Sequence, residues 1–199
     1  MESQQEIWEK IASDWHKYKE IPSKLSQAFL KQRSGKVLDL GSGSGRHLTK
    51  IKNGKMYLAD FSENMIKLAK QKAKKLGIEA EFKVADMTNL PYENNFFDAA
   101  ISISAFHCLN PKQHKKAAKE LYRVMKPKAE ALIGVWSKES KRFRRYKTKE
   151  KYIGWTTKGK RYYYLFTEGE IHDLFKDVGF KFQSRHNSEL MINFIIQKP

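Results

Sequence analysis

The chain has one cysteine, Cys108, among 199 residues, and this excludes an internal disulfide. The absence of disulfides fits a reducing compartment, so we expect a cytoplasmic protein. No apolar run approaches the roughly 20 residues of a membrane span, and the polar residues 1–5 do not resemble a signal peptide. The six histidines are scattered, and no Cys/His cluster has metal-ligand spacing, so we expect no metal site.

Acidic residues are scarce, since 22 Asp and Glu stand against 39 Lys and Arg, for a net charge of +17. Residues 138–161 hold eleven Lys and Arg and two acids, a local +9, and aromatic residues are interleaved there and just beyond. Cations neutralise phosphates and aromatic rings stack on unpaired bases, so this segment predicts nucleic-acid binding. The alternative explanation of the positive charge is a lysine-rich composition caused by genome bias or adaptation to heat. Residues 67–75 are interpreted as a solvated helix face.

A glycine-rich turn follows the first apolar run. Val37, Leu38 and Leu40 predict a buried parallel strand, and Asp39 lies within it. The turn then brings the chain close to a ligand, because glycine has no side chain. The pattern is DxGxGxG, and a helix is expected at residues 46–52. The cofactor-binding residues predicted in this segment are Asp39, Gly41, Ser42, Gly43 and Gly45.

Two further acids end the next two predicted strands. Asp60 lies 21 residues after Asp39, where a carboxylate accepts hydrogen bonds from both hydroxyls of a nucleoside ribose. The alternative for Asp60 is a helix N-cap, and the alternative for Asp86 is a turn residue. This set of residues resembles the cofactor motifs of class I S-adenosylmethionine (SAM) methyltransferases. The resemblance implies SAM as cofactor, with Asp86 and the backbone N–H of Met87 at the adenine, and adds Phe61 and Ser102 to the cofactor-binding residues.

The order of elements predicts an α/β fold with a Rossmann-like, doubly wound seven-stranded sheet. Its last two strands, at 180–184 and 190–196, should form an antiparallel C-terminal hairpin. We expect one domain over residues 1–199. Two helices in residues 1–33 should lie over the cofactor as a lid, and residues 137–161 are expected to be a basic insertion in the form of a long loop.

The chain also resembles a narrower family, the tRNA wobble-uridine methyltransferases that esterify 5-carboxymethyluridine. The resemblance lies in residues 7–12, 102–107, Val135-Trp136 and, above all, the run Arg161-Tyr-Tyr-x-x-Phe-x-Glu-Gly-Glu. It implies a tRNA substrate, and a small zinc-binding activator subunit as a heterodimer partner. The chain departs from the family where Lys17 stands about at the place of an Arg, and where Phe106-His107 stand in place of two adjacent histidines.

The same resemblance assigns roles at the acceptor side. His107 orients the carboxylate or the base, Arg161 holds a carboxylate or phosphate, and Trp136 packs on the flipped base; a structural, solvated or core role is the alternative for each. A carboxylate is already a nucleophile, so no catalytic triad is expected. The predicted substrate-binding residues are Lys17, Tyr18, Arg142, Arg144, Arg145, Tyr162 and Tyr163.

Two other functions stay open. A small-molecule methyltransferase acting on a quinone or phenol would have the same fold, but an apolar lid and no basic, aromatic insertion. A non-catalytic RNA-binding protein on a degenerate fold would not need the intact glycines and strand-end acids.

Overall fold

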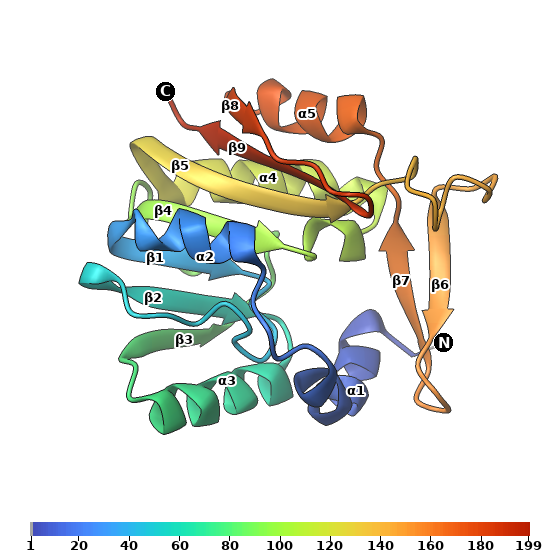
Figure 1. The fold of residues 1–199 in the computed structure, drawn as a ribbon, viewed down its shortest axis with the longest axis horizontal. Helices are drawn as coiled ribbons and strands as arrows, with labels where there is room; N and C mark the ends of the chain where they lie inside the picture. Colours follow the sequence, from blue (N-terminus) through green and yellow to red (C-terminus); the bar gives the residue numbers. More distant parts are fainter. Residues whose placement is uncertain (1) are drawn as a thin grey trace.

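A seven-stranded sheet with helices on both faces organises residues 2–199, which the computed structural model describes (Figure 1). The strand order is β3-β2-β1-β4-β5-β9-β8. Strands β1 to β5 are parallel, β9 runs antiparallel to β5, and β8 runs antiparallel to β9. This confirms the predicted Rossmann-like sheet with its antiparallel C-terminal pair. The parallel strands all end at the edge that faces α1 and the β6–β7 hairpin (Figure 1).

The elements agree with the sequence pattern except in two segments described below. The strands of the main sheet are β1 (Ser34–Leu40), β2 (Lys52–Asp60), β3 (Ala80–Val84), β4 (Phe97–Ile103), β5 (Met125–Trp136), β8 (Lys181–Arg185) and β9 (Met191–Gln197). The helices are α1 (Gln4–Tyr18), α2 (Lys24–Lys31), α3 (Glu63–Leu76), η1 (Phe106–Cys108), α4 (Pro111–Val124) and α5 (Glu168–Asp177), and a separate hairpin comprises β6 (Glu150–Gly154) and β7 (Lys160–Tyr164). No helix within residues 2–199 has the length and apolar character needed to cross a membrane.

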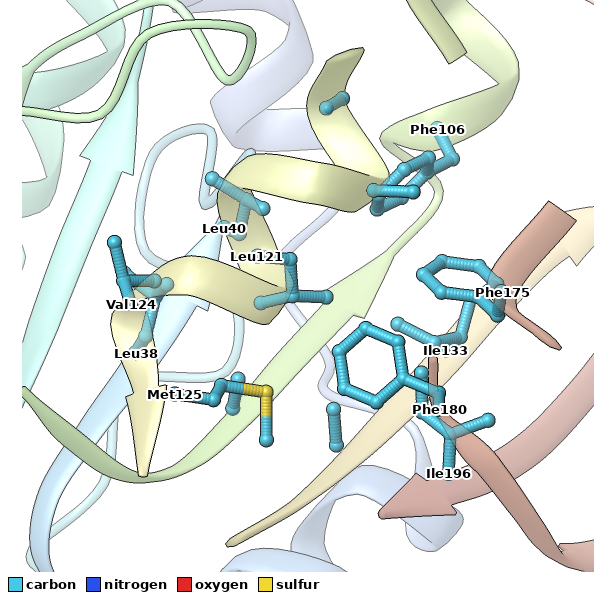
Figure 2. Close-up of a cluster of buried hydrophobic side chains, with 14 of the residues drawn as sticks. Leu38, Leu40, Phe106, Leu121, Val124, Met125, Ile133, Phe175, Phe180 and Ile196 are labelled. Atoms are coloured by element: carbon cyan, nitrogen blue, oxygen red, sulfur yellow. The ribbon is translucent and has the colours of Figure 1, made fainter. Parts of the chain in front are cut away.

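Two apolar clusters fill the two faces of the sheet. On one face, Leu121 of α4 and Phe175 of α5 pack with Ile133 of β5, and Figure 2 shows these side chains converging. On the other face, α2 and α3 bury Leu30 and Ala69 against the strands. Each large side chain removed from water in this way stabilises the fold by about 1.5–3 kcal/mol. The sheet is thereby held rigid, so its strand ends can position a site.

The helix expected after the glycine turn is absent, so the prediction for residues 46–52 is wrong. The chain runs through turns from Gly41 to His47 and is irregular until β2 begins at Lys52. Two features of these residues disfavour a helix. Gly45 has a left-handed φ of +77°, and Leu48 and Ile51 are both buried against the sheet face. Too few residues remain to complete helical turns and still reach the start of β2.

The basic insertion is also more ordered than a long loop. Strands β6 and β7 pair antiparallel from Glu150↔Tyr164 to Gly154↔Lys160, and the hairpin stands beyond the strand ends of the main sheet (Figure 1). Strand β6 alternates between exposed and half-buried residues, and β7 buries three successive side chains, Arg161, Tyr162 and Tyr163. The predicted loop therefore contains a strand pair whose inner face contacts η1 and α1.

Helix α1 connects the hairpin with the main sheet. Its Glu9 carboxylate accepts from the backbone N–H groups of Glu63 and Asn64 at the N-terminus of α3, at 2.5 and 2.9 Å. At the other side, the Gln4 amide oxygen accepts from Tyr162 N at 2.7 Å, and Asp14 accepts from the Trp155 indole at 3.1 Å. A carboxylate at a helix N-terminus is a favourable arrangement, so α1 is tied to both of its neighbours.

Candidate functional site

A cavity of about 360 Å³ opens at the carboxyl ends of β1, β2 and β4, where open α/β sheets bind ligands. Helix α1 and the β6–β7 hairpin form its outer wall. Eleven of the predicted site residues line it: Gly41, Ser42, Gly43, Asp60, Phe61, Asp86, Met87, His107, Trp136, Tyr162 and Tyr163. The fold therefore brings the predicted cofactor residues and part of the predicted acceptor residues to one space.

The glycine turn contributes a wall without side chains. Gly41 has φ +73°, and a Cβ there would lie 2.3 Å from the Ala105 Cβ, so only glycine fits. Gly43 has φ +54°, and a Cβ there would find Met65 Sδ at 4.0 Å and nothing closer. The space beside Gly43 is thus open, and a ligand can approach the backbone there.

Asp60 ends β2 directly beneath this turn. Its Oδ2 accepts from Gly43 N at 2.8 Å, and its Oδ1 accepts from Ser62 N at 3.0 Å. Burial raises the pKa of Asp60 to about 6, and the two backbone donors oppose this shift. The predicted N-cap alternative does not apply, because the N-cap of α3 is Ser62. Each carboxylate oxygen keeps a second lone pair that can accept from a hydroxyl.

Asp39 lies deeper, with 1% of its surface exposed, and does not line the cavity. Its Oδ2 is 4.0 Å from Nδ1 of His47 and has no hydrogen-bond partner within the described residues. Burial, and then the charge of Asp60, raise the pKa of Asp39 to about 8, while burial lowers the pKa of His47 to about 3. Both side chains are therefore neutral near pH 7 in this structure.

Three predicted adenine-side residues line the cavity where β2 and β3 end. Asp86 follows β3 and is exposed, and its Oδ1 accepts from Thr88 N at 2.7 Å. It is thus a turn residue that also lines the cavity. Met87 and Phe61 line the same end and supply apolar surface for a planar ring.

Two predicted cofactor residues have packing roles instead. A Cβ on Gly45 would lie 3.2 Å from the Ala69 Cβ, so this glycine permits close packing of the turn against α3. Ser102 is buried, and its hydroxyl donates to Leu40 O at 3.0 Å, which joins β4 to β1. Neither residue lines the cavity.

Aromatic rings form the mouth of the cavity beside the ends of β4 and β5. Trp136 stacks on Tyr163 with ring centroids 4.3 Å apart, and His107 lies 4.8 Å from Trp136. His107 is buried, and its Nδ1 accepts from Trp136 N at 2.9 Å. Burial lowers the pKa of His107 to about 3. The ring is neutral, and its proton is therefore on Nε2, ready to donate.

Arg161 is a buried cation in an aromatic cage. Only 5% of its surface is exposed, and its Cζ lies 4.8 to 5.8 Å from the rings of Trp155, Trp15, Trp8 and Tyr163. Its Nη1 donates to the Tyr163 hydroxyl at 2.7 Å, but its Nε has no partner within residues 2–199. Arg161 does not itself line the cavity, although three of the four caging rings do.

The remaining predicted substrate residues lie outside the cavity. Lys17 and Tyr18 form the exposed last turn of α1. Arg144 and Arg145 are exposed in the turns after β5, and the exposed Arg142 has its Cζ 5.3 Å from the Trp136 ring. They border the mouth as a basic surface and do not enter it.

Sequence reasoning missed several polar residues that line the cavity, among them Lys19, Arg46 and His47. The signal for the last two was their place directly after the glycine pattern, but the helix expected there pointed to a packing role. Among residues 2–199, no group of three or more His, Cys, Asp or Glu is arranged to hold a metal ion.

The residues that line the cavity are chemically compatible with S-adenosylmethionine. The open space beside Gly43 admits a ligand against the backbone, Asp60 offers acceptors to ribose hydroxyls, and Asp86 offers one to an exocyclic amine. The mouth with Trp136 and His107 lies at the ends of β4 and β5.

Known methyltransferases are similar to part of this chain. A family model described as "Methyltransferase domain" matches residues 37–128. The tRNA (carboxymethyluridine(34)-5-O)-methyltransferase of Arabidopsis thaliana is 41% identical over 104 residues, which cover 52% of this chain and 24% of that protein. The ubiquinone/menaquinone biosynthesis C-methyltransferase UbiE of Escherichia fergusonii is 35% identical over 114 residues, covering 54% and 45%. The matches thus span less than half the length of these curated relatives.

Solved structures share the fold over nearly the whole chain. A SAM-dependent methyltransferase from Methanosarcina mazei has a TM-score of 0.75 at 24% identity, covering 89% of this chain and 98% of its own. A complex between the Haloferax volcanii Trm112 methyltransferase activator and a candidate methyltransferase contains a chain with a TM-score of 0.75 at 17% identity, covering 99% and 98%. A class I SAM-dependent methyltransferase is supported by the glycine turn, the strand-end acids, the sheet order and the methyltransferase-domain match over residues 37–128.

Proposed function

We propose that this chain methylates the carboxylate of 5-carboxymethyluridine at the wobble position of tRNA. The observation that carries the proposal is Arg161, a guanidinium that is 5% exposed and has no acidic partner within residues 2–199. Three of the four rings that cage it line the cofactor cavity. A buried cation without a counter-ion is costly, and an anionic acceptor would remove that cost. The likeness to the Arabidopsis tRNA (carboxymethyluridine(34)-5-O)-methyltransferase supports the same acceptor.

The chemistry asks little of the protein beyond positioning. The cofactor supplies a methyl group on a positively charged sulfur. The acceptor carboxylate is a nucleophile at neutral pH, and its attack yields a neutral ester, so no proton has to be removed. The chain's residues orient the carboxylate in line with the methyl group and exclude water. Holding the two reacting groups in this geometry accelerates the transfer.

His107 and Trp136 have separate roles in this proposal. His107 stays neutral because burial lowers its pKa to about 3, and Trp136 N already occupies its Nδ1. It therefore donates from Nε2 to the acceptor and does not serve as a general base. Tyr163 is buried behind Trp136, which is half-buried and lines the cavity, so in this proposal the exposed part of Trp136 is the surface against which a base turned out of the anticodon packs.

The surface around the mouth suits RNA. Arg142, Arg144 and Arg145 are exposed, and the Cζ of Arg142 lies 5.3 Å from the ring of Trp136, which lines the cavity. In the proposal these cations contact phosphates of the anticodon arm. Lys17 and Tyr18 extend the same surface on α1.

Two features of the organisation belong to the proposal. Helix α1 acts as a lid on the cofactor in this proposal, since its Gln4, Trp8 and Trp15 line the cavity. The expected lid role of the second helix is wrong, because α2 packs Leu30 on a face of the sheet and does not line the cavity. The chain, as one domain, works with a small zinc-binding activator subunit; the support is the Haloferax volcanii complex with the Trm112 methyltransferase activator. Co-expression with the activator from the same source should give a 1:1 complex. Full activity without co-purification contradicts this part.

A methyl-transfer assay tests the acceptor. Labelled SAM is incubated with the chain, alone and with the activator, and with tRNA that carries 5-carboxymethyluridine. Nucleoside mass spectrometry should show a methyl ester on that base, and tRNA that lacks the carboxymethyl group serves as the control. Label on a ring carbon or a ribose rejects the proposal.

The second candidate is a small-molecule methyltransferase, which the 35% identity to UbiE over 114 residues favours. Label on an added quinone precursor, with none on tRNA, establishes that candidate instead. The basic surface at the mouth weighs against it, because an apolar acceptor gains nothing from exposed arginines.

A further inference from the structure

Ser104 directly follows the end of β4 and has a strained backbone. Its φ is +64°, in the left-handed region, which a residue with a Cβ adopts only at a cost. Four other non-glycine residues within 2–199 have a positive φ: Asn53, Asn95, Lys128 and Thr156. None of these four lines the cavity, whereas Ser104 does. Residues strained in this way cluster at functional sites, so the Ser104 side chain is a candidate for a role in this one.

Contacts of the main chain hold Ser104 in this conformation. Its N–H donates to Gly134 O of β5 at 2.8 Å, and its carbonyl accepts from the thiol of Cys108 at 3.6 Å. The next residue, Ala105, packs against Gly41, where a Cβ would lie 2.3 Å from the Ala105 Cβ. A glycine at position 104 would make the same main-chain contacts without strain. The fold itself therefore does not require a serine.

The Ser104 hydroxyl is available to a ligand. Within residues 2–199 it has no hydrogen-bond partner, whereas the hydroxyl of Ser102, two residues earlier, donates to Leu40 O. His107 lies three residues later and also lines the cavity, and Nε2 of its neutral ring carries a proton because Nδ1 accepts from Trp136 N. The turn after β4 therefore presents two uncharged donors to the cavity.

We propose that the Ser104 hydroxyl binds the acceptor group by donating a hydrogen bond to a carboxylate oxygen, beside the bond from Nε2 of His107. A carboxylate suits two donors because its oxygens only accept, and hydrogen bonds to an ionised acceptor are the strong ones. Both donors can share one oxygen, which leaves the other oxygen facing the cofactor. A phenol suits the turn less, since it has a proton to lose and neither nitrogen of His107 is open to take it. The carboxylate in this inference rests on the proposed function.

Binding without turnover tests the contact. The full chain, saturated with S-adenosylhomocysteine, is titrated with two anticodon stem-loop RNAs that differ in one group. One carries 5-carboxymethyluridine, and the other carries the uncharged amide, 5-carbamoylmethyluridine. The parent should prefer the carboxylate RNA. Ser104→Ala and Ser104→Gly both lack the hydroxyl, so each should reduce this preference about tenfold, as measured by fluorescence anisotropy.

Two controls separate the hydroxyl from the backbone. Ser104→Gly also removes the strain, so it should melt at least as high as the parent although it binds the carboxylate RNA more weakly. Thr156→Gly removes the same kind of strain in the exposed turn of the β6–β7 hairpin, where φ is +49°, and should leave the preference unchanged. Affinity for S-adenosylhomocysteine, measured by calorimetry, should equal that of the parent in every variant.

The outcomes distinguish this inference from the proposed function. A parent that binds both RNAs equally rejects the proposed function, and the carboxylate contact of Ser104 with it. A parent that prefers the carboxylate RNA, with variants at position 104 that keep the preference, overturns the role of Ser104 and leaves the proposed function standing. A loss in Ser104→Ala that is absent in Ser104→Gly assigns Ser104 a backbone role and likewise overturns the inference.

Discussion

The hydroxyl of Tyr163 accepts a 2.7 Å hydrogen bond from Nη1 of Arg161, two residues earlier on the same short strand. Tyr163 also stacks on Trp136, which in turn covers His107. Burial raises the pKa of the Tyr163 phenol, so it stays protonated and neutral. One strand of the inserted hairpin thus orients the buried cation and completes the aromatic mouth.

Arg161→Lys should lower kcat/KM for tRNA by about a hundredfold, because a lysine ammonium cannot form the planar fork that holds a carboxylate. Tyr163→Phe removes one hydrogen bond from the charged guanidinium and should cost about 1.5 kcal/mol, or roughly tenfold. The measurement is steady-state kinetics at saturating SAM. Affinity for S-adenosylhomocysteine should stay the same in both variants, and equal effects of the two substitutions would assign Arg161 a packing role only.

Asp60→Ala should weaken S-adenosylhomocysteine by about 2–4 kcal/mol, because it removes the acceptor of two ribose hydroxyls. It also frees the N–H groups of Gly43 and Ser62, so folding must be verified by thermal unfolding. Asp60→Asn is the control that keeps the shape and one acceptor. Calorimetric affinity equal to that of the parent would place the ribose elsewhere.

Asp39→Asn should change how stability depends on pH. The folded-state pKa of Asp39 is raised to about 8 from 3.8, so the folded state keeps a proton that the unfolded state releases. Its contribution to stability is therefore complete below about pH 4 and is lost as pH rises toward 8. At about 1.4 kcal/mol per pKa unit, the difference amounts to a few kcal/mol.

The asparagine variant removes this titration. Its free energy of unfolding, measured in urea without ligand, should exceed that of the parent increasingly from pH 5 to pH 8. A constant difference across that range contradicts an uncharged Asp39.

The sequence predicts the main sheet well because its signals are local. Apolar runs ended by Asp60 and by the residue pair Asp86-Met87 mark strands, and Thr167 with Glu170 marks the start of α5 through a capping box. These patterns involve neighbours in the chain and need no knowledge of tertiary contacts. The cavity at the strand ends follows from the fold itself.

The features that the sequence did not predict depend on contacts between segments that are distant in the chain. Nothing near Gly45 in the sequence indicates that it packs on Ala69, and that contact, with the short path to β2, displaces the expected helix. The buried state of Arg161 likewise requires Trp8 of α1, which is distant in the chain, together with Trp155 in the turn of the hairpin.

The basic surface at the mouth should show itself in the salt dependence of tRNA binding. Each phosphate neutralised by a cation adds to the slope of log K against log salt. A triple substitution of Arg142, Arg144 and Arg145 to Gln should flatten that slope by about two to three units and raise the KM for tRNA, while affinity for S-adenosylhomocysteine stays unchanged. These side chains are exposed, so folding should not be affected.

The matched control removes the same charge from the solvated face of α3, with Lys67, Lys70 and Lys74 changed to Gln. If both triple variants lower the slope equally, the attraction to tRNA is a property of the net charge of +17 and not of this surface. A lower slope only in the arginine variant locates the path of the RNA across the turns after β5 and toward Trp136, where Arg142 already lies over the ring.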